Sequence, residues 1–127
     1  MFKRCHAVLP VTELDPVIKF YEECLGFTLM ATHQEGGELE WCRLRSGRAD
    51  VMFYSPAASG DPEPECTDWA KVRLYFVVDE LESLRAILLA RHCAPSEIAS
   101  TAYGMYEFDI IDPSGYRLTF AEAITQD

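Results

Sequence analysis

The feature of this sequence that most constrains its fold is a weak internal repeat at an offset of about 67 residues. The segment VTELD at 11–15 aligns with VDELE at 78–82, and each follows a short apolar stretch and precedes a helical pattern. The same offset aligns VMF at 51–53 with LTF at 118–120, two strand-like segments whose outer residues are apolar. Agreement at both ends predicts two copies of one unit.

The chain length and the spacing of the repeat set the domain organisation. A chain of 127 residues has the size of one domain with a real core, so residues 1–127 are predicted to form a single domain. Within it we expect a first module over 4–54, a linker over 55–70 and a second module over 71–122. The linker is rich in Pro, Gly, Ala and acidic residues.

Each module is predicted to contain one helix and several strands. The first helix has a face at helical spacing and the second is expected to begin at Asp79 as its cap and to end near His92. The first start stays open between Thr12 and Asp15, and Gly26 should end that helix. The predicted helix cores are Leu14, Val17 or Ile18, Tyr21 and Leu25 in the first, and Leu81, Leu84, Leu88 and Arg91 or Ile87 in the second. Strand-like runs cover 7–11, 27–32, 39–44, 50–54, 74–78, 106–111 and 116–120, so that each half reads β-α-β-β-β.

Charge and cysteine content exclude several classes of function. The formal net charge is −10 and the basic residues are scattered, which argues against nucleic acid as a partner and is compatible with a neutral or cationic small ligand. No apolar run approaches the roughly 20 residues of a membrane span. The five cysteines form no CxxC pair, which argues against a zinc knuckle or a disulfide framework and favours a reducing, cytoplasmic setting.

Several motifs together resemble one known superfamily. They are HAVLPV at 6–11, FY at 20–21, LGF at 25–27 and DPSGY at 112–116. In combination they are similar to the vicinal oxygen chelate superfamily of glyoxalases, bleomycin-resistance proteins and dioxygenases, and closest in type to the bleomycin-resistance members. The resemblance covers residues 4–122 and implies an α+β fold, in which paired βαβββ modules form a curled mixed sheet around a cleft. It also implies a homodimer.

The resemblance assigns four metal-ligand positions, and most of them hold the wrong residue types. Enzymatic members place ligands on the first and last strand of each module, which correspond here to His6, Met52, Arg73 and Thr119. Only His6 is a ligand that hard or borderline divalent cations accept. A guanidinium at position 73 would oppose a divalent cation. We therefore expect no cofactor and no metal, with His6 as the one candidate metal ligand.

Two carboxylates lie on the strand before the DPSG turn. Glu107 and Asp109 are two residues apart, so both project from one face of that strand. They could receive a cation or supply a general base, with Glu107 as the candidate catalytic residue. Alternatively, they form ion pairs with Arg73 or Arg117.

Aromatic residues are expected to line the same cleft. They are Trp41, Tyr54, Tyr75, Tyr103 and Tyr106, and stacked rings of this kind bind flat or cationic ligands. The facing of Trp41 is ambiguous by one residue, because a one-residue slip would turn it to the opposite face. Trp69 belongs to the linker and is interpreted as a packing or dimer contact.

The leading hypothesis from sequence is a metal-free protein that binds a small molecule, including a cationic one, without catalysis. The predicted ligand-binding residues are His6, Trp41, Met52, Tyr54, Arg73, Tyr75, Glu107, Asp109 and Thr119. The alternative is a metal-dependent glyoxalase-type lyase or isomerase, or a dioxygenase-like enzyme, with a metal held by His6 and carboxylates such as Glu107.

Overall fold

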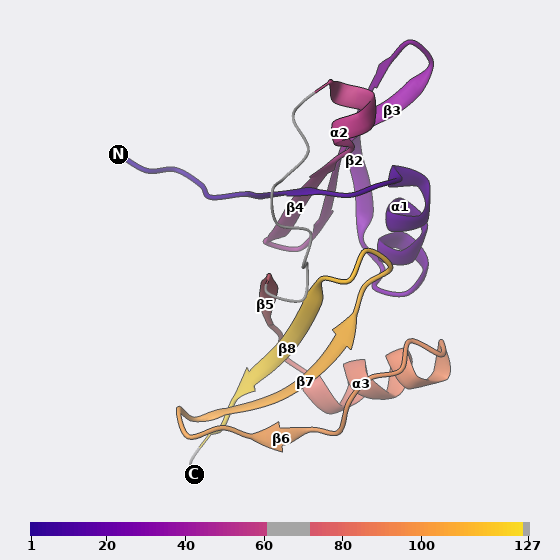
Figure 1. Ribbon diagram of the computed structural model, residues 1–127. Helices are drawn as coiled ribbons and strands as arrows, with labels where there is room; N and C mark the ends of the chain where they lie inside the picture. Colours follow the sequence, from indigo (N-terminus) through magenta and orange to yellow (C-terminus); the bar gives the residue numbers. More distant parts are fainter. Residues whose placement is uncertain (61–71, 126–127) are drawn as a thin grey trace. The chain divides into compact units, whose positions relative to one another are not determined.

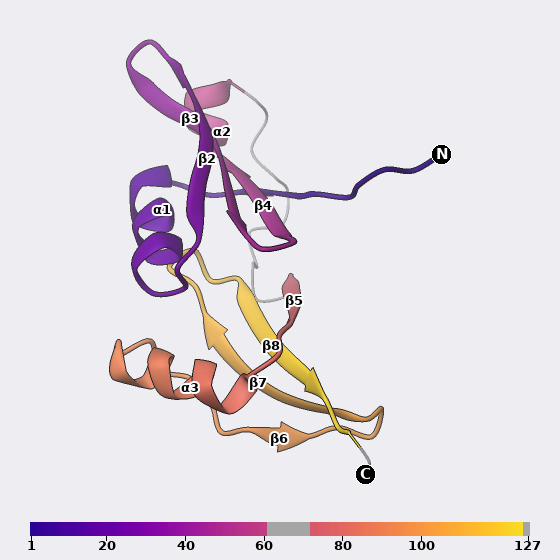
Figure 2. The same ribbon diagram turned by 180° about the vertical axis from the view of Figure 1, so that it is seen from behind.

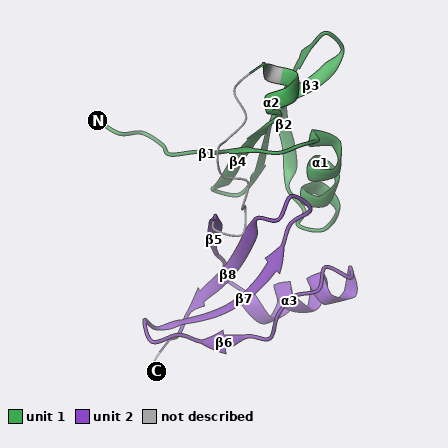
Figure 3. Cartoon of the chain, viewed as in Figure 1, with its two compact units in different colours: residues 1–67 green, residues 68–127 purple. Residues whose placement is uncertain are grey.

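The chain forms two compact units, residues 1–67 and 68–127 (Figure 3). This computed structural model describes residues 1–60 and 72–125. Each unit contains its own four-stranded sheet and its own long helix. Trp69, Cys66 and most of the predicted linker lie outside the described residues, so the role suggested for Trp69 stays a prediction.

The first unit is a mixed sheet covered by one helix (Figure 1). Its elements are β1 (Ala7–Pro10), α1 (Leu14–Glu23), β2 (Thr28–Glu35), β3 (Glu38–Ser46), β4 (Ala49–Tyr54) and the short α2 (Pro56–Ser59). The strand order is β1-β4-β3-β2, in which β1 pairs parallel with β4 and the other pairs are antiparallel. Residues 56–59 of the predicted linker therefore belong to a helical turn.

The second unit repeats this topology (Figure 2). Its elements are β5 (Arg73–Val77), α3 (Leu81–Ala90), β6 (Ala99–Ser100), β7 (Met105–Ile111) and β8 (Arg117–Ala123). The strand order is β5-β8-β7-β6, with β5 parallel to β8. The α+β fold with two βαβββ modules is confirmed, each module having a sheet of its own.

Strand register confirms the repeat that the sequence predicts. In the first unit Val8 pairs with Met52, and in the second unit Tyr75 pairs with Thr119. Both members of the second pair lie at the offset of about 67 residues from their counterparts. Positions aligned in sequence are thus equivalent in the two sheets.

The core of each unit lies between its helix and one face of its sheet. In the first unit the predicted helix residues Leu14, Val17, Ile18 and Tyr21 are buried, and the Tyr21 ring packs 5.1 Å from the Phe53 ring. In the second unit Leu81 and Leu88 are buried below the sheet residues Phe108 and Phe120, whose rings stack at 5.2 Å. These apolar contacts fix which sheet face points inward and which stays open.

The helix ends differ from prediction in small, local ways. Helix α1 begins at Leu14 after Glu13 and ends before Leu25, which is half-buried, while Gly26 takes the positive φ expected of a helix stop. Helix α3 has Glu80, and not Asp79, at its N-cap position. No side chain of Glu80 bonds there; instead the Leu81 amide donates to the Glu122 carboxylate at 3.4 Å. A partner on β8 replaces the local cap that the sequence pattern suggested.

No helix in the described ranges combines the length and the apolar character that a bilayer crossing requires.

Candidate functional site

The candidate site is built on the sheet faces that the helices leave open. Side chains alternate along a strand, so the burial of Cys42 and Leu44 against the helix turns Trp41 and Arg43 to the open face of β3. Phe108 and Ile110 do the same for Glu107 and Asp109 on β7. Most of the residues predicted to bind ligand lie on these two open faces.

Arg73 is fixed by hydrogen bonds at the edge of the second sheet. Its Nε donates to the Thr119 hydroxyl at 2.7 Å and its Nη2 donates to Glu107 Oε1 at 3.0 Å. The guanidinium also lies over the Tyr75 ring, 5.2 Å from the centroid. Burial of the guanidinium acts against its charge, but the Tyr103 hydroxyl and the Glu107 carboxylate outweigh this effect and raise the pKa of Arg73. It therefore stays a cation at every physiological pH.

Glu107 accepts hydrogen bonds from three side chains. The Tyr75 and Tyr103 hydroxyls both donate to Oε2 at 2.5 Å, and Arg73 donates to Oε1. Burial disfavours the charged carboxylate, yet the two tyrosyl hydroxyls and the nearby guanidinium prevail and lower the pKa of Glu107. The hydrogen bond to Glu107 in turn raises the pKa of Tyr75 to about 12. Glu107 is thus ionised, but its lowered pKa and the three donors on its oxygens make it a weak general base.

Asp109 is connected to the same network through a buried hydroxyl. Arg117 donates to Asp109 Oδ2 at 3.1 Å from Nε and 2.8 Å from Nη2. The Thr119 hydroxyl, which is fully buried, donates to Asp109 Oδ1 at 2.6 Å while accepting from Arg73. Of the two alternatives for the carboxylates, the structure forms the ion pairs.

The first unit carries the matching arrangement around Asp50. Arg43 forms a forked ion pair with Asp50, with contacts of 2.9, 3.0 and 2.6 Å. His6 Nδ1 lies 3.4 Å from Asp50 Oδ1, but it is buried and makes no hydrogen bond in the described part of the chain. The Arg43 hydrogen bond lowers the pKa of Asp50 below its usual range, and the nearby His6 contributes in the same direction.

The repeat places these two ion pairs at equivalent positions with the charges exchanged. Arg43 pairs in register with Met52, as Asp109 pairs with Thr119. Arg43–Asp50 in one sheet therefore corresponds to Asp109–Arg117 in the other. Asp50 was not predicted as a site residue, although it aligns with Arg117 at the repeat offset, because the two residues carry opposite charges.

Four of the five predicted aromatic residues lie on the open faces or contact a residue there. Trp41 pairs with Tyr54 across β3 and β4, which resolves the facing of Trp41 in favour of the open face. Tyr75 and Tyr103 contact Glu107. Tyr106 was placed wrongly, because it precedes Glu107 on β7 and so turns to the helix-covered side, where it borders a cavity at the start of α3.

A family model now identifies the relationship. Residues 4–120 match the model described as the Glyoxalase/Bleomycin resistance protein/Dioxygenase superfamily. The chain belongs to this superfamily. The resemblance drawn from the HAVLPV, FY, LGF and DPSGY segments is confirmed. No curated protein matches the sequence.

Solved structures agree with the fold of the superfamily. A lactoylglutathione lyase from Agrobacterium tumefaciens is similar with a TM-score of 0.75 at 17% identity, over 94% of this chain and 92% of that one. TnmS3, an antibiotic binding protein from Streptomyces sp. CB03234, gives 0.72 at 20% identity over 97% of both chains. A glyoxalase-related enzyme from Clostridium phytofermentans gives 0.77 at 15% identity, over 98% and 97%. At these identities the likeness concerns the fold alone.

The metal-ligand positions of the superfamily do not fit a divalent cation in this chain. In the second unit the two ligand positions hold Arg73 and Thr119, and these residues are hydrogen-bonded to each other. In the first unit Met52 offers only a thioether, and the carboxylate nearest to His6 is already bound by Arg43. A permanent guanidinium charge beside such a site opposes a second cation.

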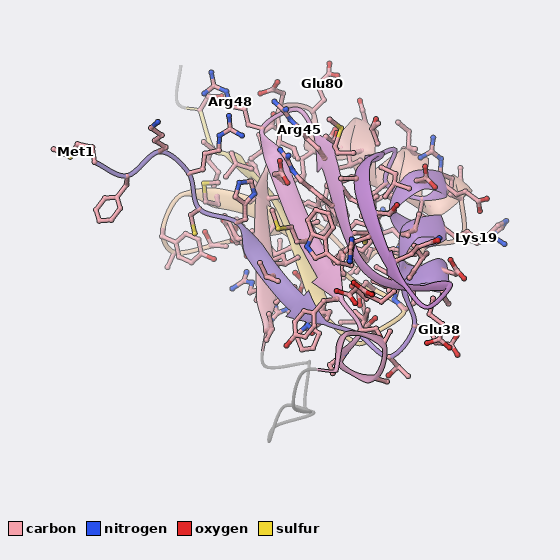
Figure 4. The ribbon with its side chains drawn as sticks, turned by 90° about the horizontal axis from the view of Figure 1, so that it is seen from above. Met1, Lys19, Glu38, Arg45, Arg48 and Glu80 are labelled. Atoms are coloured by element: carbon pink, nitrogen blue, oxygen red, sulfur yellow. The ribbon has the colours of Figure 1, made fainter. Side chains whose placement is uncertain are left out.

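One group of metal-type ligands lies elsewhere, and the sequence did not predict it. His33, Glu35 and Glu40 bring their ligand atoms within 4.8 Å of one another, with His33 Nε2 3.0 Å from Glu35. The group is at the β2–β3 hairpin, since β2 continues through His33 to Glu35 instead of ending at Thr32. Figure 4 shows Glu38 at this hairpin and Arg45 and Arg48 at the opposite end of β3. His33 and Glu35 are exposed, so their contact is a hydrogen bond at the surface in competition with water.

Two cavities repeat at the helix starts, away from the open faces. One of about 580 Å³ is lined by Thr12, Glu13, Leu14, Asp15 and Ser55 together with residues of the β2–β3 hairpin. The other, of about 500 Å³, is lined by Asp79, Glu80, Leu81, Glu82 and Glu122 with Ser83, Ile98 and Tyr106. The first five residues of each set correspond through the repeat. None of the nine predicted ligand-binding residues lines either cavity.

Proposed function

We propose that this protein binds a small molecule without a metal ion, and that the open face of the second unit, around Arg73, Tyr75 and Glu107, supplies the polar part of its binding site. The observation that carries the proposal is the state of Arg73. Its guanidinium stands where enzymatic relatives place a metal ligand, and it is fixed there by Thr119 and Glu107. The permanent positive charge of this guanidinium opposes the binding of a divalent metal ion at the same position.

The composition of the open faces supports binding over chemistry. Glu107 and Asp109 are held in ion pairs, and the raised pKa of Tyr75 keeps its hydroxyl protonated. These groups are poor proton acceptors and poor nucleophiles in that state. Rings at Tyr75 in the second unit and at Trp41 and Tyr54 in the first offer flat apolar surface to a ligand. His6 and Met52 lie on the first unit at positions equivalent to Arg73 and Thr119.

The name of TnmS3 as an antibiotic binding protein fits a binding role of this type, and that of the lyase fits the enzymatic alternative. The ion-pair geometry around Arg73 supports the binding role. We also propose a homodimer, which the resemblance to the short members of the superfamily implies; exposed apolar side chains such as Val77, at 71%, would be available to its interface. Light scattering would measure the mass directly, and a monomer would refute this part.

The test is a thermal-shift screen of metabolites and antibiotics in a chelator-containing buffer. A ligand present at 100 times its Kd should stabilise the protein by about 2.7 kcal/mol. Tyr75→Ala should weaken the binding of any hit. Tyr106→Ala is the matched control, because the two tyrosines are exposed at 41% and 43% but lie on opposite faces of the same sheet. Stabilisation that requires an added divalent metal would refute the proposal.

A further inference from the structure

The two carboxylates on the open face of the second unit have almost no accepting capacity left. Glu107 accepts from Arg73, Tyr75 and Tyr103, and Asp109 accepts two N–H groups of Arg117 and the hydroxyl of Thr119. Each therefore receives three donors, where an ionised carboxylate offers about four acceptor positions. A cationic ligand would need these oxygens for its own N–H groups and would have to break existing bonds to reach them.

The guanidinium groups on the same face have donors to spare. Arginine carries about five N–H donors. Arg73 donates to Thr119 from Nε and to Glu107 from Nη2. Arg117 donates to Asp109 from its own Nε and Nη2. The Tyr103 hydroxyl also bonds to Arg73, which leaves about two N–H donors on Arg73 and about three on Arg117 without a partner among these contacts.

Two tyrosine rings stand beside the donor edge of Arg73. Their hydroxyls are held by Glu107, so the rings are fixed while remaining exposed, at 41% for Tyr75 and 64% for Tyr103. Fixed and exposed rings lose little conformational entropy when a flat group stacks on them. Arg73 adds a planar group of its own against the Tyr75 ring.

We infer that the open face of the second unit selects aromatic ligands that carry an oxygen acceptor, above all a carboxylate, and that Arg73 is the residue that binds the acceptor. This inference rests on the proposed function and adds the ligand class to it. It differs from the expectation of a cationic ligand that the net charge suggests.

Local donors outweigh the overall charge in this selection. The net charge of −10 favours cations at long range, but exposed charges are largely screened beyond about 8 Å at physiological salt. Around Arg73 the positive charges of Arg73 and Arg117 balance the negative charges of Glu107 and Asp109. The choice of ligand then depends on hydrogen bonds at contact distance, where the surplus consists of donors.

The experiment compares three probes that share one ring system and differ in charge. They are 1-naphthoate, 1-naphthamide and 1-naphthylmethylammonium, titrated calorimetrically into the full chain with chelator present. We expect naphthoate to bind about tenfold or more tightly than the ammonium compound, as one charge-assisted hydrogen bond provides, with the amide between them. Arg73→Gln should remove this preference. Arg85→Gln is the control, because Arg85 in α3 bonds to the Ser96 carbonyl and Glu97, away from the open face.

Each outcome has a defined meaning. Equal or tighter binding of the ammonium probe, or naphthoate binding unchanged by Arg73→Gln, overturns the inference and leaves the proposed function standing if the binding depends on Tyr75. Hits in the wider screen combined with no binding of any naphthyl probe also overturn the inference alone. A screen without any metal-independent hit overturns both.

Discussion

Thr119→Val removes a single buried hydroxyl that connects both ion pairs of the second unit, while keeping the shape of the side chain. Thr119 is fully buried, accepts from Arg73 Nε at 2.7 Å and donates to Asp109 Oδ1 at 2.6 Å. A hydrogen bond to a charged group contributes about 1.5–3 kcal/mol net. The Arg73 and Asp109 side chains are 36% and 27% exposed, so water replaces part of each lost contact. We therefore expect the variant to lose about 1.5–3 kcal/mol for both bonds together.

The assay is equilibrium urea unfolding followed by circular dichroism. Thr32→Val is the control, because Thr32 is exposed on β2 and the exchange keeps a β-branched residue; its effect should stay within about 0.5 kcal/mol. A double-mutant cycle with Arg73→Met isolates the bond to Arg73, whose coupling energy should be about 0.5–1.5 kcal/mol. A coupling energy of zero would refute the claim that Thr119 holds Arg73 in place.

Three further results are expected from the same contacts. Because Arg43 lowers the pKa of Asp50 in the folded state, the stability that this carboxylate contributes is present above its unfolded pKa and is lost as the pH falls through the lower folded pKa. The melting temperature of Asp50→Asn should consequently fall less than that of the parent protein as the pH drops below about 4, and equal slopes would contradict this. Glu107→Gln should shift one tyrosine titration, read by ultraviolet absorbance, from about 12 towards its ordinary value near 10, and Tyr75→Phe should remove that transition; an unchanged titration would show that Glu107 does not bond to Tyr75. Burial raises the pKa of Cys42 to about 11, so Cys42→Ala should leave the number of thiols that react rapidly with a disulfide reagent at pH 8 unchanged, whereas the loss of one would show that Cys42 is accessible.

Much of the fold was predictable because the sequence contains two copies of the same module. The offset that aligns VTELD with VDELE also aligns the strand registers, since equivalent residues pair with equivalent partners in each sheet. The helix faces were predictable from periodicity, because burial of residues such as Tyr21 and Leu88 is what stabilises the helices. The cap of α3 was not, because its bonding partner Glu122 lies on a strand far along the chain.

The candidate site was predictable where the period of a strand decides the facing. Glu107, Asp109 and Thr119 share a face for that reason. Tyr106 follows the same period, which turns it to the other face, but it was predicted from its residue type instead. The hydrogen bond from Tyr103 to Glu107 depends on the path of the chain before β7, which periodicity does not describe. The connection of Arg73 to Asp109 through Thr119 required atomic distances.

The proposed metal-free function depends most on Arg73 taking the place of a metal ligand. The most direct measurement is elemental analysis of the protein purified without chelator and then offered zinc, nickel, iron and manganese, on the parent chain, on His6→Ala and on His33→Ala. We expect far less than one ion per chain, and any residual zinc should disappear with His33→Ala, because His33, Glu35 and Glu40 form the metal-type cluster of the described residues. Near one tightly held ion per chain that His6→Ala removes would contradict the metal-free function.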